Sequence, residues 1–290
     1  MVLLTYHRVK EDAGANTLGT IVPLKAFKRQ VESAAKKYRV VSLSEGERLM
    51  REGGARGTNI VLTFDDGYSD NYHTVFPLLR RMGLPAIFFL STGYVGSGRP
   101  LWDSELMSAI CAEKEADNID ICGRMMTRKK RESALDYAYR VFNAMKSADI
   151  RTLEGVLQAL GDAATAGRGY ADDPCMGWED ALRMREAGME IGSHGVTHRS
   201  LARIPFEEAA GEIRESKAVI EGNVMSECRH FSFPFGSRND YNGGLIAAVK
   251  SAGYATCLLN IHGYNHFDSD RYALKRIIME EHADISSLLG

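Results

Sequence analysis

Two carboxylates stand side by side where an apolar segment of the chain ends. Asp65 and Asp66 directly follow the apolar, β-branched stretch Asn59–Phe64, and Gly67 comes after them. This order predicts a buried strand that ends in a sharp turn, because glycine adopts backbone angles that are closed to other residues. Adjacent residues of an extended chain point to opposite faces, so the two carboxylates could have different tasks at one strand end. The alternative is a turn in which both aspartates only cap the next helix.

A second polar cluster follows another short apolar segment. His194 and His198 come after Met189–Gly192 and are four positions apart. If the chain turns helical after Ser193, both imidazoles lie on one face and can hold one metal ion. Together with Asp66 they form a set of three ligands that leaves one position open, which is the usual arrangement of a catalytic zinc. Ordinary structural histidines are the alternative for the pair taken alone.

These two segments resemble motifs of a known enzyme family. Thr63–Gly67 (Thr-Phe-Asp-Asp-Gly) and Ser193–His198 (Ser-His-Gly-Val-Thr-His) are similar to the first two motifs of the NodB-type polysaccharide deacetylases, carbohydrate esterase family 4. The resemblance extends from about Leu3 to about Ile278, apart from a central insertion. It implies an α/β fold, a distorted (β/α) barrel that is TIM-like and seven-stranded. An open doubly wound sheet is the alternative fold.

The rest of the chain alternates apolar stretches with amphipathic ones. Val2–Thr5, Asn59–Phe64 and Ala86–Leu90 are predicted strands separated by helical patterns, which indicates a parallel sheet covered by helices. Residues 97–173 break this alternation, since they show helical periodicity and no segment typical of a core strand. We expect a mainly helical insertion on the catalytic face of a single NodB-like domain that spans residues 1–290, serving as a lid or a substrate rim.

The composition is that of an ordinary globular enzyme, with 290 residues, 44% of them hydrophobic and 26% charged. A net charge of −2 gives no reason to expect nucleic acid or an anionic membrane as a partner. The five cysteines are scattered and odd in number, which favours free thiols in a reducing compartment. The N-terminal apolar run is too short for a signal segment or a transmembrane segment. We therefore expect a cytoplasmic protein, unless an N-terminal segment has been lost, and the sequence gives no indication of its oligomeric state.

The resemblance also implies a reaction and roles for the motif residues. Such an enzyme is a metal-dependent hydrolase that removes N-acetyl groups from amino sugars of a polysaccharide, an oligosaccharide or a glycolipid precursor. Asp66, His194 and His198 would hold a divalent ion, with Zn²⁺ favoured and Co²⁺, Ni²⁺ or Fe²⁺ also suited to these ligands. Asp65 would be the general base, and the backbone N–H of Phe235 would donate to the oxyanion.

The proton donor for the departing amine is less clearly marked. The family supplies a histidine from a late Leu-x-His motif, and the closest segment here, Leu258–His262, has a different spacing. We take His262 as the first candidate, followed by His266 and by His7, which comes directly after the first predicted strand. An ordinary loop histidine is the alternative at each of these positions.

Three further residues are candidates for substrate contact. The family often has an arginine two residues before the proline of its third motif, where this chain has Ser232, so Arg238 is the candidate for orienting charge. Tyr68 could stack on a sugar ring, and His7 could contact the substrate. The family's Asp-x-x-Asp-Trp type motif has no clear counterpart. Two other functions remain open, namely removal of a formyl or other acyl group from a non-polymeric amide, and carbohydrate binding without turnover.

Overall fold

Seven parallel strands form a closed barrel in the order β1, β12, β11, β10, β9, β6 and β5, and β5 pairs back onto β1. The computed structural model describes residues 1–289 apart from 13–17, 54–56, 113–116, 122 and 161–172. The predicted distorted (β/α) barrel is therefore confirmed. The strands of the barrel are β1 (Val2–Tyr6), β5 (Asn59–Phe64), β6 (Ile87–Leu90), β9 (Glu190–Ser193), β10 (His230–Ser232), β11 (Thr256–His262) and β12 (Leu274–Ile278), and the short β4 (Arg39–Val40) pairs with the start of β5.

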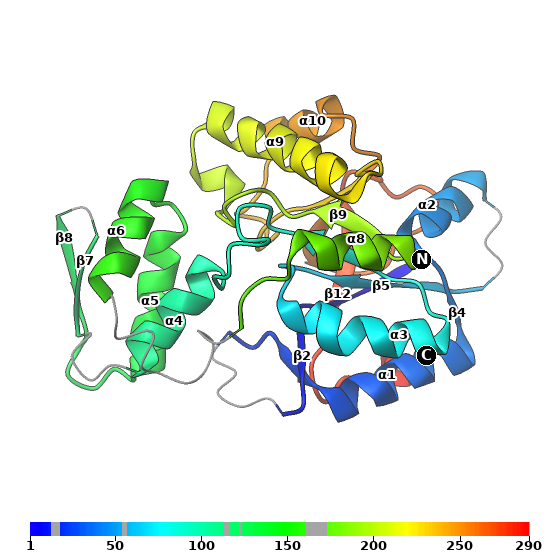
Figure 1. Ribbon diagram of the computed structural model, residues 1–290, viewed down its shortest axis with the longest axis horizontal. Coiled ribbons are helices and arrows are strands. Elements are labelled where there is room, and N and C mark those ends of the chain that lie inside the picture. The colour runs from blue at the N-terminus through cyan, green and yellow to red at the C-terminus, as the bar shows by residue number, and fades with distance from the viewer. Residues whose placement is uncertain (13–17, 54–56, 113–116, 122, 161–172, 290) are drawn as a thin grey trace.

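Helices cover the outside of the barrel, with α1, α3 and α8 on one side of it and α9 and α10 on the other (Figure 1). These elements are α1 (Leu24–Lys37), α2 (Leu43–Glu52), the π-helical turn η1 (Asn71–Val75), α3 (Phe76–Met82), α8 (Trp178–Glu186), the 3-10 turn η3 (Leu201–Arg203), α9 (Phe206–Val224), α10 (Gly243–Ser251) and α11 (Ile285–Leu289). A separate parallel pair joins β2 (Arg8–Lys10) to β3 (Ile21–Pro23). Within the described part of the chain, no helix has both the length and the apolar character needed to cross a membrane.

The interior of the barrel changes from apolar to polar along the strands. Leu3 and Val61 belong to a buried cluster at the amino end, where Met50 of α2 packs against them. The next residues inward on β1 and β5 are Thr5 and Thr63, which are fully buried and whose hydroxyl oxygens are 3.1 Å apart. Burying a polar group costs free energy unless it is hydrogen-bonded, and this pair meets that requirement. The charged residues of the candidate site follow at the carboxyl ends of the strands.

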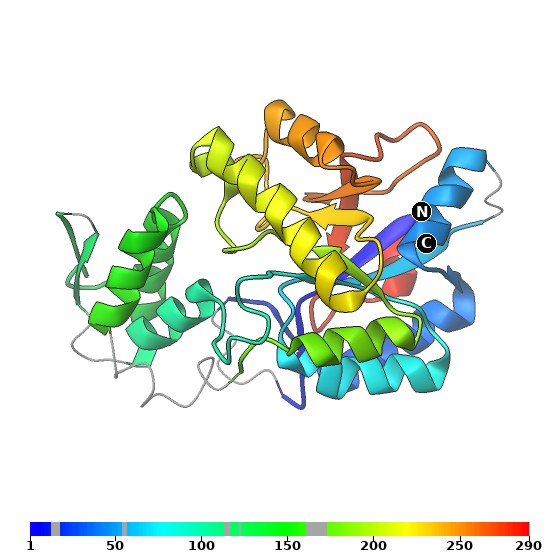
Figure 2. The same cartoon turned by 45° about the horizontal axis from the view of Figure 1, so that its top comes forward.

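Residues 97–173 leave the barrel after β6 and return to it before α8. They contain α4 (Trp102–Ala112), the antiparallel hairpin of β7 (Asn118–Ile121) and β8 (Arg124–Thr127), α5 (Ala134–Met145) and α6 (Ile150–Leu160), and these elements share a hydrophobic core of their own. In both views they stand on one side of the barrel, and both chain termini lie on the other side (Figures 1 and 2). The last part of the predicted insertion, residues 161–172, lies outside the described residues.

Candidate active site

Asp65 is held in place by a buried arginine from the far end of the chain. Nη1 of Arg276, on β12, lies 2.8 Å from Oδ1 and 2.7 Å from Oδ2 of Asp65. The hydroxyl of Ser232 donates to Oδ2 at 3.4 Å. Asp65 is 2% exposed and Arg276 is 1% exposed, so water does not screen this ion pair. These charge-assisted bonds fix the direction in which the Asp65 carboxylate points.

Asp65 and Asp66 both line a cavity at the carboxyl ends of the barrel strands. Asp66 reaches it because β5 ends at Phe64 and the backbone then turns. The φ angle of Asp66 is 81°, in the left-handed region that side chains disfavour. Four described residues other than glycine have positive φ angles, and three of them, Asp66, His198 and Phe235, line this cavity. Backbone strain concentrated in one place is typical of a functional site, where the surrounding structure maintains it.

His194 and His198 lie in the loop after β9. Gly195 has a φ angle of 77° and His198 one of 53°, and a right-handed helix excludes both values. The segment is therefore not the helical turn that its spacing allows. The loop still brings the two imidazoles together, with ring centroids 5.2 Å apart. Glu212 of α9 stabilises the loop by accepting hydrogen bonds from two of its backbone N–H groups at 3.1 and 3.0 Å.

The carboxylate and the two imidazoles converge on one point. Nε2 of His194 is 3.5 Å and Nε2 of His198 is 3.2 Å from Oδ1 of Asp66. The three potential ligand atoms lie within 4.8 Å of one another. Two ligands of a tetrahedral zinc ion, each about 2.1 Å from it, are roughly 3.4 Å apart, so the distances from Asp66 to the two histidines fit a single ion. Nδ1 of His194 bonds the carbonyl oxygen of Ser232 at 2.7 Å, which directs Nε2 toward the shared point.

The insertion supports His198 through two buried residues at the start of α4. Oδ2 of Asp103 lies 3.4 Å from Nδ1 of His198. The indole N–H of Trp102 donates to the carbonyl oxygen of His198 at 2.8 Å. Nδ1 of His198 has no hydrogen-bond partner among the described residues, so Asp103 acts on the ring through its negative charge, which raises the basicity of the imidazole. No role for Asp103 could be inferred from the sequence, since no pattern in it indicates that α4 packs beside the histidine loop.

The burial of these groups and their mutual charges change their pKa values. Burial of His198 opposes its protonation, but the carboxylates of Asp103 and Asp66 raise its pKa to about 10. Burial alone would raise the pKa of Asp66, yet the charge of His198 and the hydrogen bonds from His194 and His198 hold that pKa well below its usual range. The cluster therefore keeps Asp66 ionised and attracts positive charge, either a proton or a metal ion.

The cluster opens into a cavity of about 420 Å³, a size that suits a small ligand. Barrel and insertion share its walls. The barrel contributes the ends of its strands and the loops that follow them, and α5 of the insertion faces them. Besides the carboxylates and the two imidazoles, the lining includes His7, Phe235, Asn260, Tyr139, Phe142 and Lys146.

Of the three histidines considered as proton donors, the structure brings only His7 to this cavity. His262 is exposed and lies outside the cavity lining, because the register of β11 against β12 shifts between Leu258 and His262. Asn260 lines the cavity instead, and its buried side-chain oxygen has no hydrogen-bond partner in the part of the chain that the structure describes. His266 is exposed beside Met1, at the amino end of the barrel.

Phe235 lines the cavity, but Arg238 and Tyr68 do not. Arg238 is exposed. Tyr68 is 1% exposed, and its hydroxyl oxygen is 2.5 Å from that of Ser104, so it supports α4 from below the cavity surface. The arginine that meets Asp65 is Arg276. A charged residue inside the otherwise mostly apolar strand β12 is the signal that could have identified it.

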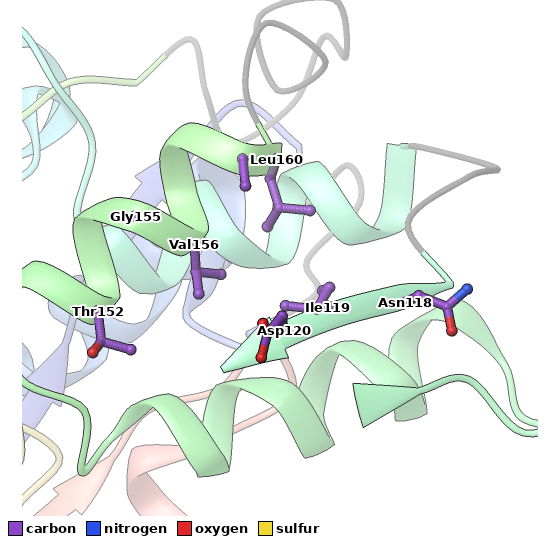
Figure 3. Close-up of a pocket in the computed structure, with 8 residues that line it drawn as sticks. Asn118, Ile119, Asp120, Thr152, Gly155, Val156 and Leu160 are labelled. Atoms are coloured by element: carbon purple, nitrogen blue, oxygen red, sulfur yellow. The ribbon is translucent and has the colours of Figure 1, made fainter. Parts of the chain in front are cut away.

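A second hollow of about 280 Å³ lies inside the insertion, between β7 and α6 (Figure 3). Figure 3 shows β7, which carries Asn118, Ile119 and Asp120, running alongside α6, which carries Thr152 and Val156. Asp120 is its one charged lining residue among those that the structure describes, and histidine, cysteine, lysine and arginine are missing from that lining. Among the described residues, Asp120 has no second titratable group beside it in this hollow, so the cavity at the barrel is the candidate active site.

Acidic and imidazole side chains at the carboxyl ends of parallel barrel strands define the active-site face of a (β/α) barrel enzyme. The family model "Polysaccharide deacetylase" matches residues 52–257. The chain therefore belongs to the polysaccharide deacetylase family. It is 25% identical, over 277 residues, to a protein of Bacillus subtilis (strain 168) provisionally named polysaccharide deacetylase YxkH, and the match covers 95% of this chain and 70% of YxkH.

Solved structures of low sequence identity share the fold. The deacetylase PplD of Streptococcus pyogenes, solved in complex with acetate, superposes with a TM-score of 0.68 at 16% identity, covering 100% of this chain and 96% of PplD. IcaB from Ammonifex degensii gives a TM-score of 0.63 at 17% identity, with 99% and 93% of the two chains covered. Family membership supports deacetylase activity, and hence a hydrolase with a carbohydrate substrate.

Proposed function

We propose that this protein is a metal-dependent hydrolase that removes the acetyl group from an N-acetylated amino sugar. The observation that carries the proposal is the pairing of two arrangements in one cavity. Asp66, His194 and His198 offer three ligand atoms within 4.8 Å of one another, and Asp65 stands next to them, fixed by Arg276. A protein that only binds sugars has no evident need for a positioned carboxylate beside a metal set.

Asp66, His194 and His198 would hold the metal ion. Carboxylate and imidazole ligands fit Zn²⁺, which we favour, and Co²⁺, Ni²⁺ and Fe²⁺ accept the same ligands. When bound, such an ion supplies Lewis acidity toward the amide carbonyl and acidifies water. The hydrogen bond to the carbonyl of Ser232 turns His194 toward the shared point, and the negative charge of Asp103 lies behind His198.

Asp65 would act as the general base. Its Oδ2 lies 4.0 Å from Nε2 of His194, so it adjoins the ligand set without being needed in it. As water attacks the acetamide carbon, this carboxylate accepts the proton of the water. Arg276 positions Asp65, because a buried guanidinium at 2.7 Å leaves the carboxylate little freedom to rotate.

The backbone of Phe235 would stabilise the oxyanion that forms as the carbonyl is attacked. Phe235 has a φ angle of 61°, an unfavourable conformation for its side chain, and its ring is 4.9 Å from the ring of His198. A backbone N–H held rigidly at this place needs no reorganisation when charge develops. The strain in the backbone is then the cost of directing that N–H.

His7 would protonate the departing amine. It is the described cavity histidine that is not part of the ligand set, and it follows β1, whose last residues pair with β5. A histidine suits this step because its ordinary pKa lies near neutrality. Asn260 cannot donate a proton in this way, although it occupies the third position of the Leu258–Asn260 segment, where the family's motif has histidine.

The insertion would form a rim around the substrate, since the half-buried Tyr139 presents aromatic surface that can stack on a sugar ring. A carbohydrate-binding protein without turnover is the second candidate. The presence of Asn260 at a position where the family has its acid favours that candidate. Removal of a different acyl group would use the same residues on another amide.

The test is acetate release from N-acetylglucosamine oligomers and from nucleotide- or lipid-linked N-acetyl amino sugars, with Zn²⁺ added and after treatment with a chelator. We expect release that depends on the metal. Formate release from N-formyl analogues in place of acetate would favour the other acyl group. Sugar binding without any release, with stoichiometric metal bound, would contradict the hydrolase and support the binding protein.

A further inference from the structure

Lys146 is a lysine placed inside the candidate active site by the insertion. It caps the carboxyl end of α5 and lines the same cavity as Asp66, His194 and His198. Among the described lining residues it is the sole lysine or arginine. A lysine at the end of a helix usually extends into water, where it interacts with the helix dipole. This one is half-buried and lies over aromatic rings instead.

Two rings fix the position of its ammonium group. Nζ of Lys146 is 4.0 Å from the ring centroid of Phe235 and 4.7 Å from that of Phe142. Phe235 in turn packs 4.9 Å from the ring of His198. The ammonium and the metal set are thus separated by one aromatic ring, a distance that a single sugar unit and its substituents can span. Cation–π contacts hold the charge there without neutralising it.

The carboxylates around the cavity do not pair with Lys146. In the residues that the structure covers, it has no ion pair within 4.0 Å and no side-chain hydrogen bond, whereas Asp65 is bound to Arg276. Asp240 is the carboxylate that raises the pKa of Lys146 most, and it accepts hydrogen bonds from the hydroxyl groups of Ser200 and Ser237. Burial lowers the pKa of Lys146, and a neighbouring anion would oppose that change.

We propose that Lys146 binds an anionic substituent of the substrate, a phosphate or a carboxylate, carried by the amino sugar whose acetamide enters at Asp66, His194 and His198. This inference rests on the proposed deacetylase function and adds the chemical class of the substrate to it. A half-buried ammonium gains most from a partner of opposite charge that arrives with the substrate, because the cavity shields the pair from water.

The test compares neutral and charged substrates on matched variants. The substrates are the methyl glycoside of N-acetylglucosamine, its 1-phosphate and 6-phosphate, and N-acetylmuramic acid, which carries a carboxylate. Lys146→Met removes the charge and keeps an unbranched apolar side chain over the rings. Lys146→Arg keeps the charge. Lys130→Met removes an exposed lysine from the same insertion and serves as the control.

We expect Lys146→Met to lower kcat/KM at least about tenfold for one of the charged substrates, mainly through KM, and less than about twofold for the neutral glycoside. Lys146→Arg should retain most of the preference, and Lys130→Met all of it. The substrate affected distinguishes a phosphate from a carboxylate. An equal loss on neutral and charged substrates, or no loss on any, would overturn the proposal.

Binding separates this proposal from the proposed function. If the wild-type protein releases no acetate from any of these sugars, calorimetric titration with glucosamine 6-phosphate, glucosamine 1-phosphate, muramic acid and glucosamine still measures the preference for an anion. A preference that Lys146→Met abolishes would support the anion site even though the hydrolase function had failed. Equal affinity for the charged and neutral sugars would refute the anion site.

Discussion

Replacing Asp103 by asparagine should weaken metal binding without removing a ligand. Asp103 lies 3.4 Å from Nδ1 of His198, and both side chains are buried. The substitution keeps the size of the side chain and an oxygen that can accept from the backbone N–H of Ser104, but it removes the negative charge behind the imidazole. Loss of such a partner typically reduces metal affinity about 10- to 100-fold, which corresponds to about 1.4–2.7 kcal/mol.

The assay is a competition titration of Zn²⁺ against a chromophoric chelator, which reports affinity independently of turnover. Glu105→Gln is the matched control, because Glu105 lies on the same helix and pairs with Arg99 instead of His198. His198→Ala, which removes a ligand, gives the upper limit of the effect. A dissociation constant for Asp103→Asn within about twofold of wild type, with an unchanged Tm, would refute the supporting role of Asp103.

Three further outcomes follow from the geometry. Asp65→Asn should retain stoichiometric Zn²⁺ and lose turnover about 10²- to 10⁴-fold; full activity in this variant would exclude Asp65 as the base. His7→Gln should slow acetate release at least about tenfold, whereas His262→Gln should change it less than twofold, and a reversal of that order would return the role of proton donor to His262. Burial lowers the pKa of His230 to about 3, so the native state stays unprotonated between pH 6.5 and 3 while the unfolded chain binds a proton. The free energy of unfolding should therefore decrease as the pH is lowered over this range. His230 should account for about 2 kcal/mol of that decrease between pH 7 and 5. Urea unfolding at both values would show a smaller loss in His230→Gln, and an identical loss in both proteins would contradict this assignment.

The strand ends of the site could be predicted from the sequence because they depend on local order. An apolar stretch followed by two carboxylates and a glycine is typical of a strand that ends at a turn, and β5 ends at Phe64 accordingly. The geometry of the histidine loop could not be predicted in the same way. The spacing of His194 and His198 suits a helix, but tertiary contacts to Glu212 stabilise backbone angles that a helix excludes.

The sequence did not indicate which residues long-range contacts bring together at the site. Arg276 meets Asp65 across 211 positions of the chain, and only the closure of the barrel through β12 and β1 makes them neighbours. His262 illustrates the converse case. Its position in the sequence suggests a motif, but the register shift in β11 leaves Asn260 at the cavity and the histidine outside it.

The contacts of Trp102 and Asp103 with His198 have a thermodynamic consequence for the whole insertion. These two residues stand at the start of α4, in an insertion that has its own hydrophobic core. Local unfolding of the insertion is independent of the barrel only if no contacts link the two. The histidine loop is one link between the two, besides the contacts of Tyr68 with Ser104 and of Phe235 with Lys146. Suppose that a ligand binds His198 more tightly when the insertion is packed against the histidine loop. By reciprocity, that ligand stabilises the packed insertion by the same free energy with which the packed insertion strengthens the binding of the ligand. Occupancy of the site and order in a unit outside the barrel are therefore two measures of one equilibrium.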